Sequence, residues 1–175
     1  MNRKKVLAIC GSTRKNSTNE SILKGMADMR KDRIDINIFN QIDTLPHFNP
    51  EIEPGDVEVV ARFLKLIEDA DGVLFCTPEY VFSLPGSLKN AIEWTIPTTV
   101  LLNKPVAVIV ASGLGEKAFE SLILIMNTVG ATMPTESTLL IQGLRNKFDA
   151  SGIPLAEDLK RSMKKLMESF EGTMK

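Results

Sequence analysis

The feature that most constrains this chain is a regular alternation between short apolar runs and segments with helical periodicity. Three of the five apolar runs are almost continuously hydrophobic, which is typical of parallel strands buried on both faces of a sheet. The expected strands are Val6–Cys10, Ile34–Phe39, Gly72–Cys76, Val106–Ala111 and Thr138–Ile141. The expected helices cover about residues 18–29 and 87–95, and apolar stripes mark three more at residues 60–67, 118–129 and 159–170.

This alternation predicts an α/β fold in which right-handed crossovers place helices on both faces of a parallel sheet. In open sheets of this kind, ligands bind beyond the carboxyl ends of the strands, near the point where the strand order reverses. The rule selects three loops, at residues 11–19, 77–86 and 112–115. The chemistry of the protein is therefore expected at one edge of the sheet.

Length and composition narrow the function classes. At 175 residues we expect a single domain over residues 1–175, with 43% hydrophobic and 25% charged residues as in ordinary globular proteins. A net charge of −1 gives no basic field for nucleic acid or an anionic membrane. No apolar run approaches the roughly 20 residues of a membrane span, and the amino terminus lacks the apolar core of a signal peptide. Two cysteines without metal-ligand spacing fit a reduced compartment, so we expect a cytoplasmic protein without nucleic-acid or membrane partners.

The loop after the first strand gathers hydroxyl groups around a fixed positive charge. It lacks both the G-x-G-x-x-G fingerprint of dinucleotide-binding folds and the G-x-x-x-x-G-K-[ST] loop of nucleotide triphosphatases. It supplies instead Ser12, Ser17, Thr18, the Asn19 amide and Arg14 at the start of an expected helix. A helix amino terminus has unpaired N–H groups and a partial positive charge, and together with a guanidinium it suits a phosphate dianion. One hydroxyl would be enough to cap the helix, so the surplus favours anion binding over a simple polar turn.

The loop after the third strand closely resembles the signature of the NADPH-dependent FMN reductase family, and reads TPEYVFSLPGSLKNAIEW at residues 77–94. The first loop resembles the family's G-S-x-R-x-x-S-x-N motif, and residues 45–53 and 104–112 also look like family segments. The resemblance implies a flavodoxin-like three-layer sandwich with five parallel strands in the order 2-1-3-4-5. It also implies an FMN cofactor, hydride supplied by NADPH or NADH, and relatives that reduce quinones, chromate and azo dyes.

The resemblance further implies which residues hold the cofactor. The first loop would bind the FMN phosphate, through Ser12, Arg14, Ser17, Thr18 and Asn19. The second and third loops would line the isoalloxazine ring, largely with backbone groups, at Pro78, Glu79, Tyr80, Val81, Ser83, Ser112, Gly113 and Gly115. No catalytic side chain and no metal ligand is expected, because hydride transfer is the cofactors' own chemistry and the protein supplies orientation.

Two positions depart from the family pattern. After the tyrosine the family usually has asparagine and then a small residue, whereas this chain has Val81 and Phe82. The commoner double glycine of the third loop is replaced by Gly113-Leu114-Gly115. The first departure puts an aromatic side chain beside the expected ring, either as a loop anchor or as a substrate platform.

Several other residues have simpler expected roles. We expect Cys10 and Cys76 to behave as small buried hydrophobes, and the backbone of Glu79 to matter more than its charge. Trp94 is expected in helix packing or at a subunit contact. Since the family forms dimers and tetramers, the resemblance also suggests a homodimer or homotetramer, with Ala91, Ile92 and Trp94 near the interface.

The sequence thus predicts an FMN-dependent oxidoreductase that takes hydride from NAD(P)H and reduces flavin, quinone, azo or similar small acceptors by a ping-pong mechanism. One alternative is a flavodoxin-like electron carrier that does not react with nicotinamide. Flavodoxins tend to be strongly acidic and to place aromatic side chains on both faces of the ring, whereas this chain is nearly neutral with 6% aromatic residues. A second alternative is a flavin-binding regulatory protein without turnover.

Overall fold

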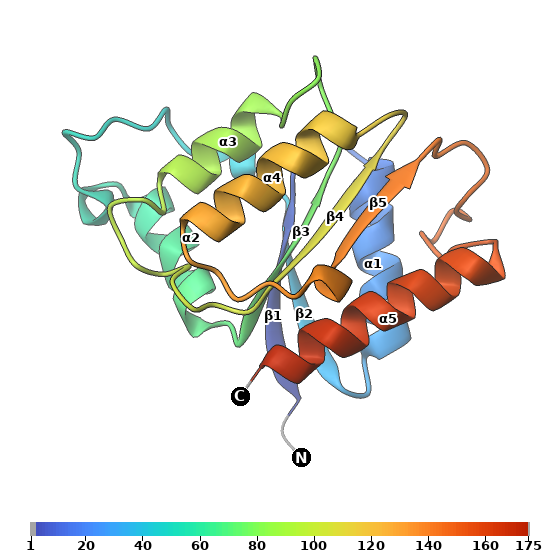
Figure 1. Cartoon of the computed structure of the whole chain (residues 1–175). Coiled ribbons are helices and arrows are strands. Elements are labelled where there is room, and N and C mark those ends of the chain that lie inside the picture. Colours follow the sequence, from blue (N-terminus) through green and yellow to red (C-terminus); the bar gives the residue numbers. More distant parts are fainter. Residues whose placement is uncertain (1–2, 175) are drawn as a thin grey trace.

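A computed structural model of the protein describes residues 3–174, and its centre is a five-stranded parallel sheet in the order β2-β1-β3-β4-β5 (Figure 1). The strands are β1 (Lys4–Cys10), β2 (Ile34–Phe39), β3 (Gly72–Thr77), β4 (Val106–Ser112) and β5 (Thr138–Gln142). The helices are α1 (Thr18–Arg30), α2 (Glu58–Asp69), α3 (Gly86–Glu93), α4 (Glu116–Thr128) and α5 (Glu157–Thr173), with short 3-10 turns at Ile42–Thr44, Pro54–Asp56 and Thr135–Ser137. The predicted fold class, strand order and alternation are confirmed.

The sheet separates two apolar cores because alternate residues of each buried strand point to opposite faces. Leu7 and Ile9 of β1 join one core, which is covered by α2, α3 and α4. Val6 and Ala8 join the other, which is covered by α1 and α5. Figure 1 shows the same three layers, with α1 and α5 on the side of the sheet opposite α2, α3 and α4.

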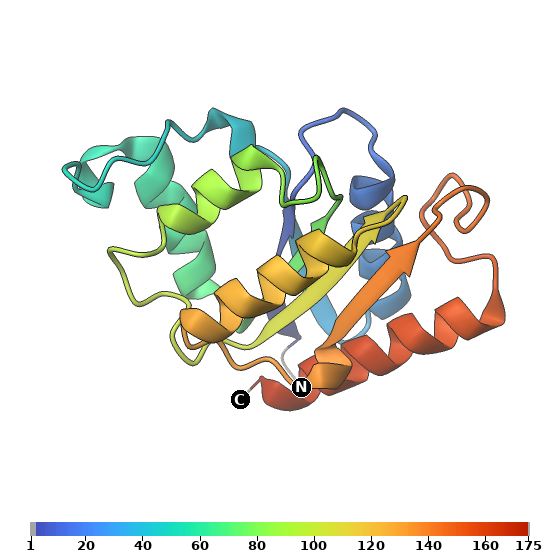
Figure 2. The ribbon, with the colours of Figure 1, turned by 45° about the horizontal axis from the view of Figure 1, so that its top comes forward.

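The strand register brings the three predicted loops to one edge of the sheet. Cys10 at the end of β1 pairs with Cys76 of β3, and Thr77 pairs with Val110 of β4. Because these parallel strands end nearly level, the loops after β1, β3 and β4 emerge side by side. Figure 2 shows them along the same edge, in blue, green and yellow.

Gly11 lets the chain leave β1 because its backbone passes very close to Thr77 of β3. A Cβ atom at this position would lie 2.2 Å from Oγ1 and 2.5 Å from Cβ of Thr77 in β3. Its N–H also donates to the carbonyl of Cys76 at 2.8 Å. Only glycine therefore lets the first loop leave the sheet this close to its neighbour.

The apolar face of helix α3 is buried in the protein's own core, which corrects the predicted interface. Ala91, Ile92 and Trp94 are at most 3% exposed in the single chain, so their side chains are not available to a second subunit. The Trp94 indole N–H donates to the carbonyl of Pro46 at 2.8 Å, and its ring packs edge-on against Phe48. Of the two roles expected for Trp94, helix packing is the correct one.

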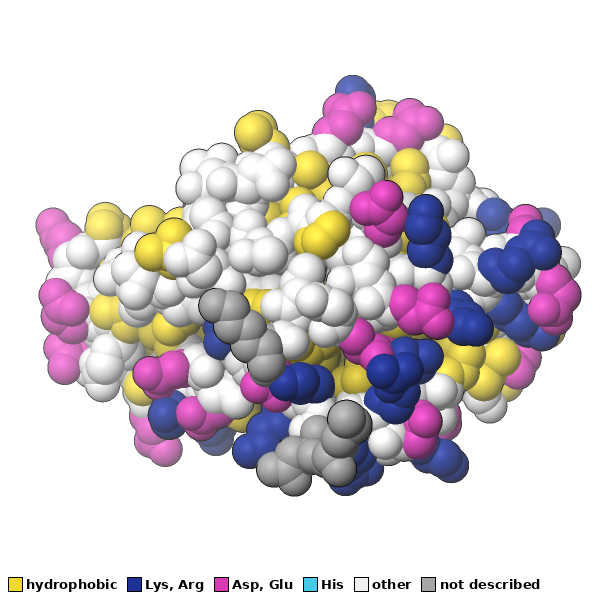
Figure 3. Space-filling model, turned by 60° about the horizontal axis from the view of Figure 1, so that its bottom comes forward, with side chains coloured by type: hydrophobic (Ala, Val, Ile, Leu, Met, Phe, Trp, Pro, Cys, Tyr) yellow, Lys and Arg dark blue, Asp and Glu magenta, His cyan; other side chains and the backbone are white. Residues whose placement is uncertain are grey.

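The opposite edge of the sheet, where the strands begin, has a mixed surface. Figure 3 shows acidic and basic side chains interspersed on this face, with apolar patches between them. Within residues 3–174, none of the helices combines the length and the apolar character needed to cross a bilayer.

The burial of α3 predicts the effect of a charge at Ile92. Ile92→Glu should lower the free energy of unfolding by about 3–5 kcal/mol, because the carboxylate would be buried without a partner. Ile96→Glu, at a side chain that is 56% exposed, should change it by less than about 0.5 kcal/mol. Urea unfolding of both variants measures the difference, and equal losses would contradict this packing.

Candidate functional site

The first loop ends in a capped helix and encloses a small polar hollow. Ser17 is the N-cap of α1, and its hydroxyl oxygen accepts from the Glu20 N–H at 3.1 Å. The Ser12 hydroxyl oxygen accepts from the Arg14 N–H at 3.4 Å. Because the Ser12 oxygen accepts, its hydroxyl proton stays available to a ligand, whereas the Ser17 hydroxyl also lies 3.9 Å from the Cys10 sulfur. The hollow has a volume of about 220 Å³ and is lined by Ser12, Thr13, Arg14, Lys15, Asn16, Glu20 and Asn40.

The charge balance of this hollow is positive. The Arg14 guanidinium is exposed and makes no hydrogen bond or ion pair within residues 3–174. Glu20 brings a carboxylate to the hollow, but Lys24 pairs with it at 2.8 Å and holds its pKa below the usual value. Arg14 and Lys15 are thus left as free cations beside the amino terminus of α1, which suits an anion.

The side chain of Asn19 has a different position from the one implied by the family resemblance. It is buried, and its amide donates to the carbonyl of Ala111 at 3.4 Å while its oxygen accepts from the Cys76 thiol at 3.4 Å. Asn19 therefore ties the start of α1 to the ends of β3 and β4. Only its backbone N–H is free to serve a phosphate.

The two cysteines support the loop from below. The Cys10 thiol donates to the carbonyl of Ser12 at 3.5 Å and lies 3.9 Å from the Ser17 hydroxyl oxygen. Burial raises the pKa of both thiols, that of Cys76 most strongly. Both are free and buried, as predicted. Their hydrogen bonds to the loop were not predictable from the sequence.

Glu79 caps helix α4 with its carboxylate, which corrects the expectation that its backbone would matter more than its charge. The two carboxylate oxygens accept from the N–H groups of Gly115 at 3.2 Å, Lys117 at 2.8 Å and Ala118 at 3.0 Å. These bonds, led by the one from Ala118, lower the pKa of Glu79. The carboxylate thereby fastens the loop after β3 to the loop after β4.

The loop after β4, at residues 112–115, has two residues, Ser112 and Gly115, that bind Glu79. The Ser112 hydroxyl oxygen accepts from the Glu79 N–H at 3.2 Å, which adds a second link between the loops. Gly115 is the N-cap of α4 with φ of 96°, a conformation that L side chains avoid, and a Cβ there would also lie 2.9 Å from Leu140. Gly113 and Leu114 are exposed between these two fixed points.

The tip of the second loop is a strained two-residue turn. Tyr80 and Ser83 exchange two backbone hydrogen bonds of 3.0 Å, and both residues between them have positive φ, 51° at Val81 and 54° at Phe82. This is a type I′ turn, which favours Asn-Gly because both central residues are left-handed. A β-branched valine in this region is a genuine outlier, and each such residue costs about 1–3 kcal/mol. Asparagine followed by glycine would adopt the same turn with less strain.

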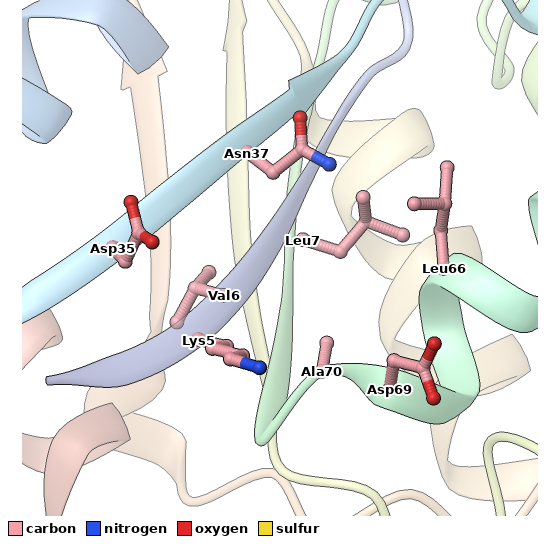
Figure 4. A pocket seen from close by; sticks show the side chains of 8 residues that line it. All are labelled: Lys5, Val6, Leu7, Asp35, Asn37, Leu66, Asp69 and Ala70. Atoms are coloured by element: carbon pink, nitrogen blue, oxygen red, sulfur yellow. The ribbon is translucent and has the colours of Figure 1, made fainter. Parts of the chain in front are cut away.

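Another hollow lies far from these loops. It is lined by residues from the beginnings of β1 and β2 and from the end of α2, as Figure 4 shows, and among them are Lys5, Asp35 and Asp69. Asp69 already pairs with Lys65 at 2.8 Å. Because this hollow is not at the carboxyl edge of the sheet, it is no part of the predicted site.

The arrangement as a whole suits a ligand with a phosphate at one end and a flat polar-edged ring at the other. The free guanidinium and the hydroxyl protons of the first loop fit the phosphate. The loops after β3 and β4 lie side by side, fixed by Glu79, and Pro78 stiffens the approach to the turn. The residues present therefore fit FMN.

Comparison with known proteins points the same way. The model of the family described as NADPH-dependent FMN reductase matches residues 4–144. The chain is 40% identical over 114 residues to a NAD(P)H:quinone oxidoreductase of Solanum tuberosum, a match that covers 62% of this chain and 59% of that enzyme. It is 30% identical over 177 residues to an NADPH:quinone oxidoreductase of Arabidopsis thaliana, covering 95% of this chain and 90% of that enzyme.

Solved structures agree on the architecture. The flavoenzyme NAD(P)H:(acceptor) oxidoreductase FerB from Paracoccus denitrificans superposes with a TM-score of 0.85 at 30% identity, covering 95% of this chain and 94% of that one. A flavodoxin from Bacillus cereus superposes with a TM-score of 0.64 at 16% identity, covering 98% of this chain and 99% of that one. The second likeness supports the flavodoxin-like fold alone.

The helix cap predicts a pH-dependent loss of stability in Glu79→Gln. The pKa of Glu79 is lowered by folding, so its contribution is fully present above the usual value of 4.5 and disappears as the pH falls through the lowered value. The melting temperature of Glu79→Gln should lie below that of the wild type at pH 7, and the gap should close below pH 4.5. Glu51→Gln removes an exposed loop carboxylate and serves as the control. A gap that persists unchanged into strong acid would contradict the cap.

Proposed function

Because the chain belongs to the NADPH-dependent FMN reductase family, we propose that it is an FMN-dependent oxidoreductase that takes hydride from NADPH or NADH and reduces small acceptors such as quinones and azo compounds. The observation that carries the proposal is the family match over residues 4–144 together with the meeting of its motif loops at one edge of the sheet. Quinone and azo acceptors are proposed because matched relatives are named NAD(P)H:quinone oxidoreductase and NADPH azoreductase.

The proposed phosphate site consists of Ser12, Arg14, Ser17, Thr18 and the backbone of Asn19. Arg14 supplies the fixed charge, and the buried hydroxyls of Ser12 and Ser17 each carry one proton that they can donate to the phosphate. Exposed Thr18 opens the first turn of α1 and adds a third hydroxyl.

The proposed ring site lies between the second and third loops. It consists of Pro78, Glu79, Tyr80, Val81, Ser83, Ser112, Gly113 and Gly115. FMN, when bound, supplies the redox chemistry, since it can accept a hydride and pass electrons on. These residues hold and orient the ring, mainly through backbone groups, and Glu79 keeps the two loops at a fixed spacing. No acid–base pair is required.

We propose a ping-pong order because nicotinamide and acceptor would share one open side of the ring site. Tyr80 and Phe82 take no part in the two aromatic pairs found in residues 3–174, Phe39 with Phe63 and Phe48 with Trp94. Their side chains are exposed. Nicotinamide and acceptor would occupy the same open side of the ring in turn. The net charge of −1, unlike the strong acidity typical of flavodoxins, favours the oxidoreductase over an electron carrier.

We further propose that residues 1–175 act as one FMN-binding domain, that the chain forms a homodimer or homotetramer, and that it works in the cytoplasm. With the apolar face of α3 buried, we propose that the subunit contact uses other apolar surface, such as Leu124 of α4, which is 67% exposed. Two free cysteines without a disulfide support a reduced compartment. Light scattering tests the assembly, and a mass of 19.3 kDa would contradict it.

The phosphate site predicts a selective defect in Arg14→Ala. FMN affinity should fall about ten- to a hundredfold, the equivalent of one charge-assisted hydrogen bond, while riboflavin affinity changes much less because riboflavin has no phosphate. Fluorescence titration of both flavins measures this. Arg3→Ala, at the other end of β1, is the matched control. Equal losses for both flavins would show that Arg14 does not contact the phosphate.

Turnover separates the oxidoreductase from its alternatives. NADH or NADPH should bleach the flavin absorbance of the FMN-loaded protein anaerobically without a partner reductase, and a quinone or azo dye should restore it. Initial-rate plots against both substrates should give parallel lines. If neither nicotinamide reduces the flavin while a separate reductase does, the protein is an electron carrier. If FMN does not bind, both assignments are wrong.

A further inference from the structure

The strained turn at the tip of the second loop is fixed firmly from both sides. Before the turn, Glu79 is held by Ser112 and by the amino terminus of α4. After it, Leu84 is buried in the core beneath α3. The two backbone bonds between Tyr80 and Ser83 close the turn itself. The left-handed conformations are therefore imposed by the fold, and they persist despite side chains that disfavour them.

The strain serves no packing purpose within the chain. Val81 is 94% exposed and Phe82 is 70% exposed, so neither side chain gains much by burial. Asparagine and glycine would form the same turn with less strain and a polar surface. Strained residues of this kind cluster at functional sites, which points to a role for the two side chains outside the fold.

A third exposed apolar side chain lies on the neighbouring loop. Leu114 is 58% exposed and stands one residue before Gly115, whose N–H is bound by the Glu79 carboxylate. Three exposed apolar side chains thus lie on the two loops that Glu79 joins. We name Val81, Phe82 and Leu114 the apolar rim.

We propose that the apolar rim, and Phe82 in particular, selects apolar planar acceptors over charged ones at the open side of the ring site. The proposal rests on the function proposed above. The rim offers three side chains on two loops, which matches one small aromatic molecule. A protein partner would need about 800 Å² of surface. An apolar ring gains affinity because its surface is removed from water when it packs on these side chains. A charged acceptor gains nothing by this contact.

The test compares two acceptors in the FMN-loaded protein, 2-methyl-1,4-naphthoquinone and ferricyanide. Phe82→Asn should lower the ratio of kcat/KM for the quinone to that for ferricyanide about tenfold, because it removes the aromatic contact. Phe82→Leu keeps an apolar side chain and should hold the ratio within about threefold. Leu114→Asn should lower the ratio severalfold.

Thermal unfolding gives a readout that does not depend on activity. Phe82→Asn should raise the melting temperature by about 2–6 °C, since asparagine tolerates the left-handed region. Val81→Asn should also raise it while reducing the acceptor ratio less, because Phe82 is kept. Asn103→Gly, at another positive φ of 57° just before β4, is the control for backbone relief and should leave the ratio unchanged.

Several outcomes would overturn the proposal. A Phe82→Asn protein with an unchanged ratio, or with equal losses for both acceptors, would show that the ring does not select. A lower melting temperature would make Phe82 a structural anchor, and a change of assembly in light scattering would make it an interface residue. Anaerobic reduction of the flavin by NADPH and by NADH is measured on the same samples. Failure of both in the wild type would reject the proposed function, whereas an altered ratio with normal reduction concerns the apolar rim alone.

Discussion

The hydrogen bonds of the Glu79 carboxylate are the interaction on which the geometry of the site depends. Parallel strands in register bring the loops after β3 and β4 to the same edge, but they do not fix the distance between loop tips. The Glu79 carboxylate fixes it, by accepting three N–H groups at the start of α4. These N–H groups would otherwise lack partners. One side chain thus satisfies a helix terminus and holds a rigid slot in place.

The loop after β1 is likewise held in place by hydrogen bonds to neighbouring elements. Ser17 caps α1, Asn19 reaches across to Ala111 and Cys76, and the Cys10 thiol donates to the carbonyl of Ser12. These contacts use the groups that face the interior and leave Arg14 and Lys15 without partners among residues 3–174. A loop already held by such contacts loses little further conformational freedom when an anion binds.

The sequence predicted those features that depend on local residue patterns, namely the strands, the helices and the loop motifs. Short apolar runs placed all five strands, and helical periodicity marked most of the helices, with boundaries that differ by at most three residues. The loop motifs identified the family correctly. It could not predict contacts between residues far apart in the chain. The partners of Glu79 lie 36 to 39 residues away, and Ala111 lies 92 residues from Asn19. The burial of α3 was missed for a related reason, because an apolar helix face covers a core or a subunit equally well by pattern alone.

The turn at Val81 and Phe82 shows where sequence pattern and local preference disagree. Valine and phenylalanine have high propensities for β-strands. The two backbone hydrogen bonds between Tyr80 and Ser83 nevertheless hold both residues in left-handed conformations. Natural sequences are locally consistent almost everywhere, so an inconsistency that survives is expected at a functional site. Here it survives because the surrounding loop is held by Glu79 and Leu84, which are not themselves strained. The stability of the rest of the fold thus offsets the strain energy of the turn, which exposes two apolar side chains beside a polar site.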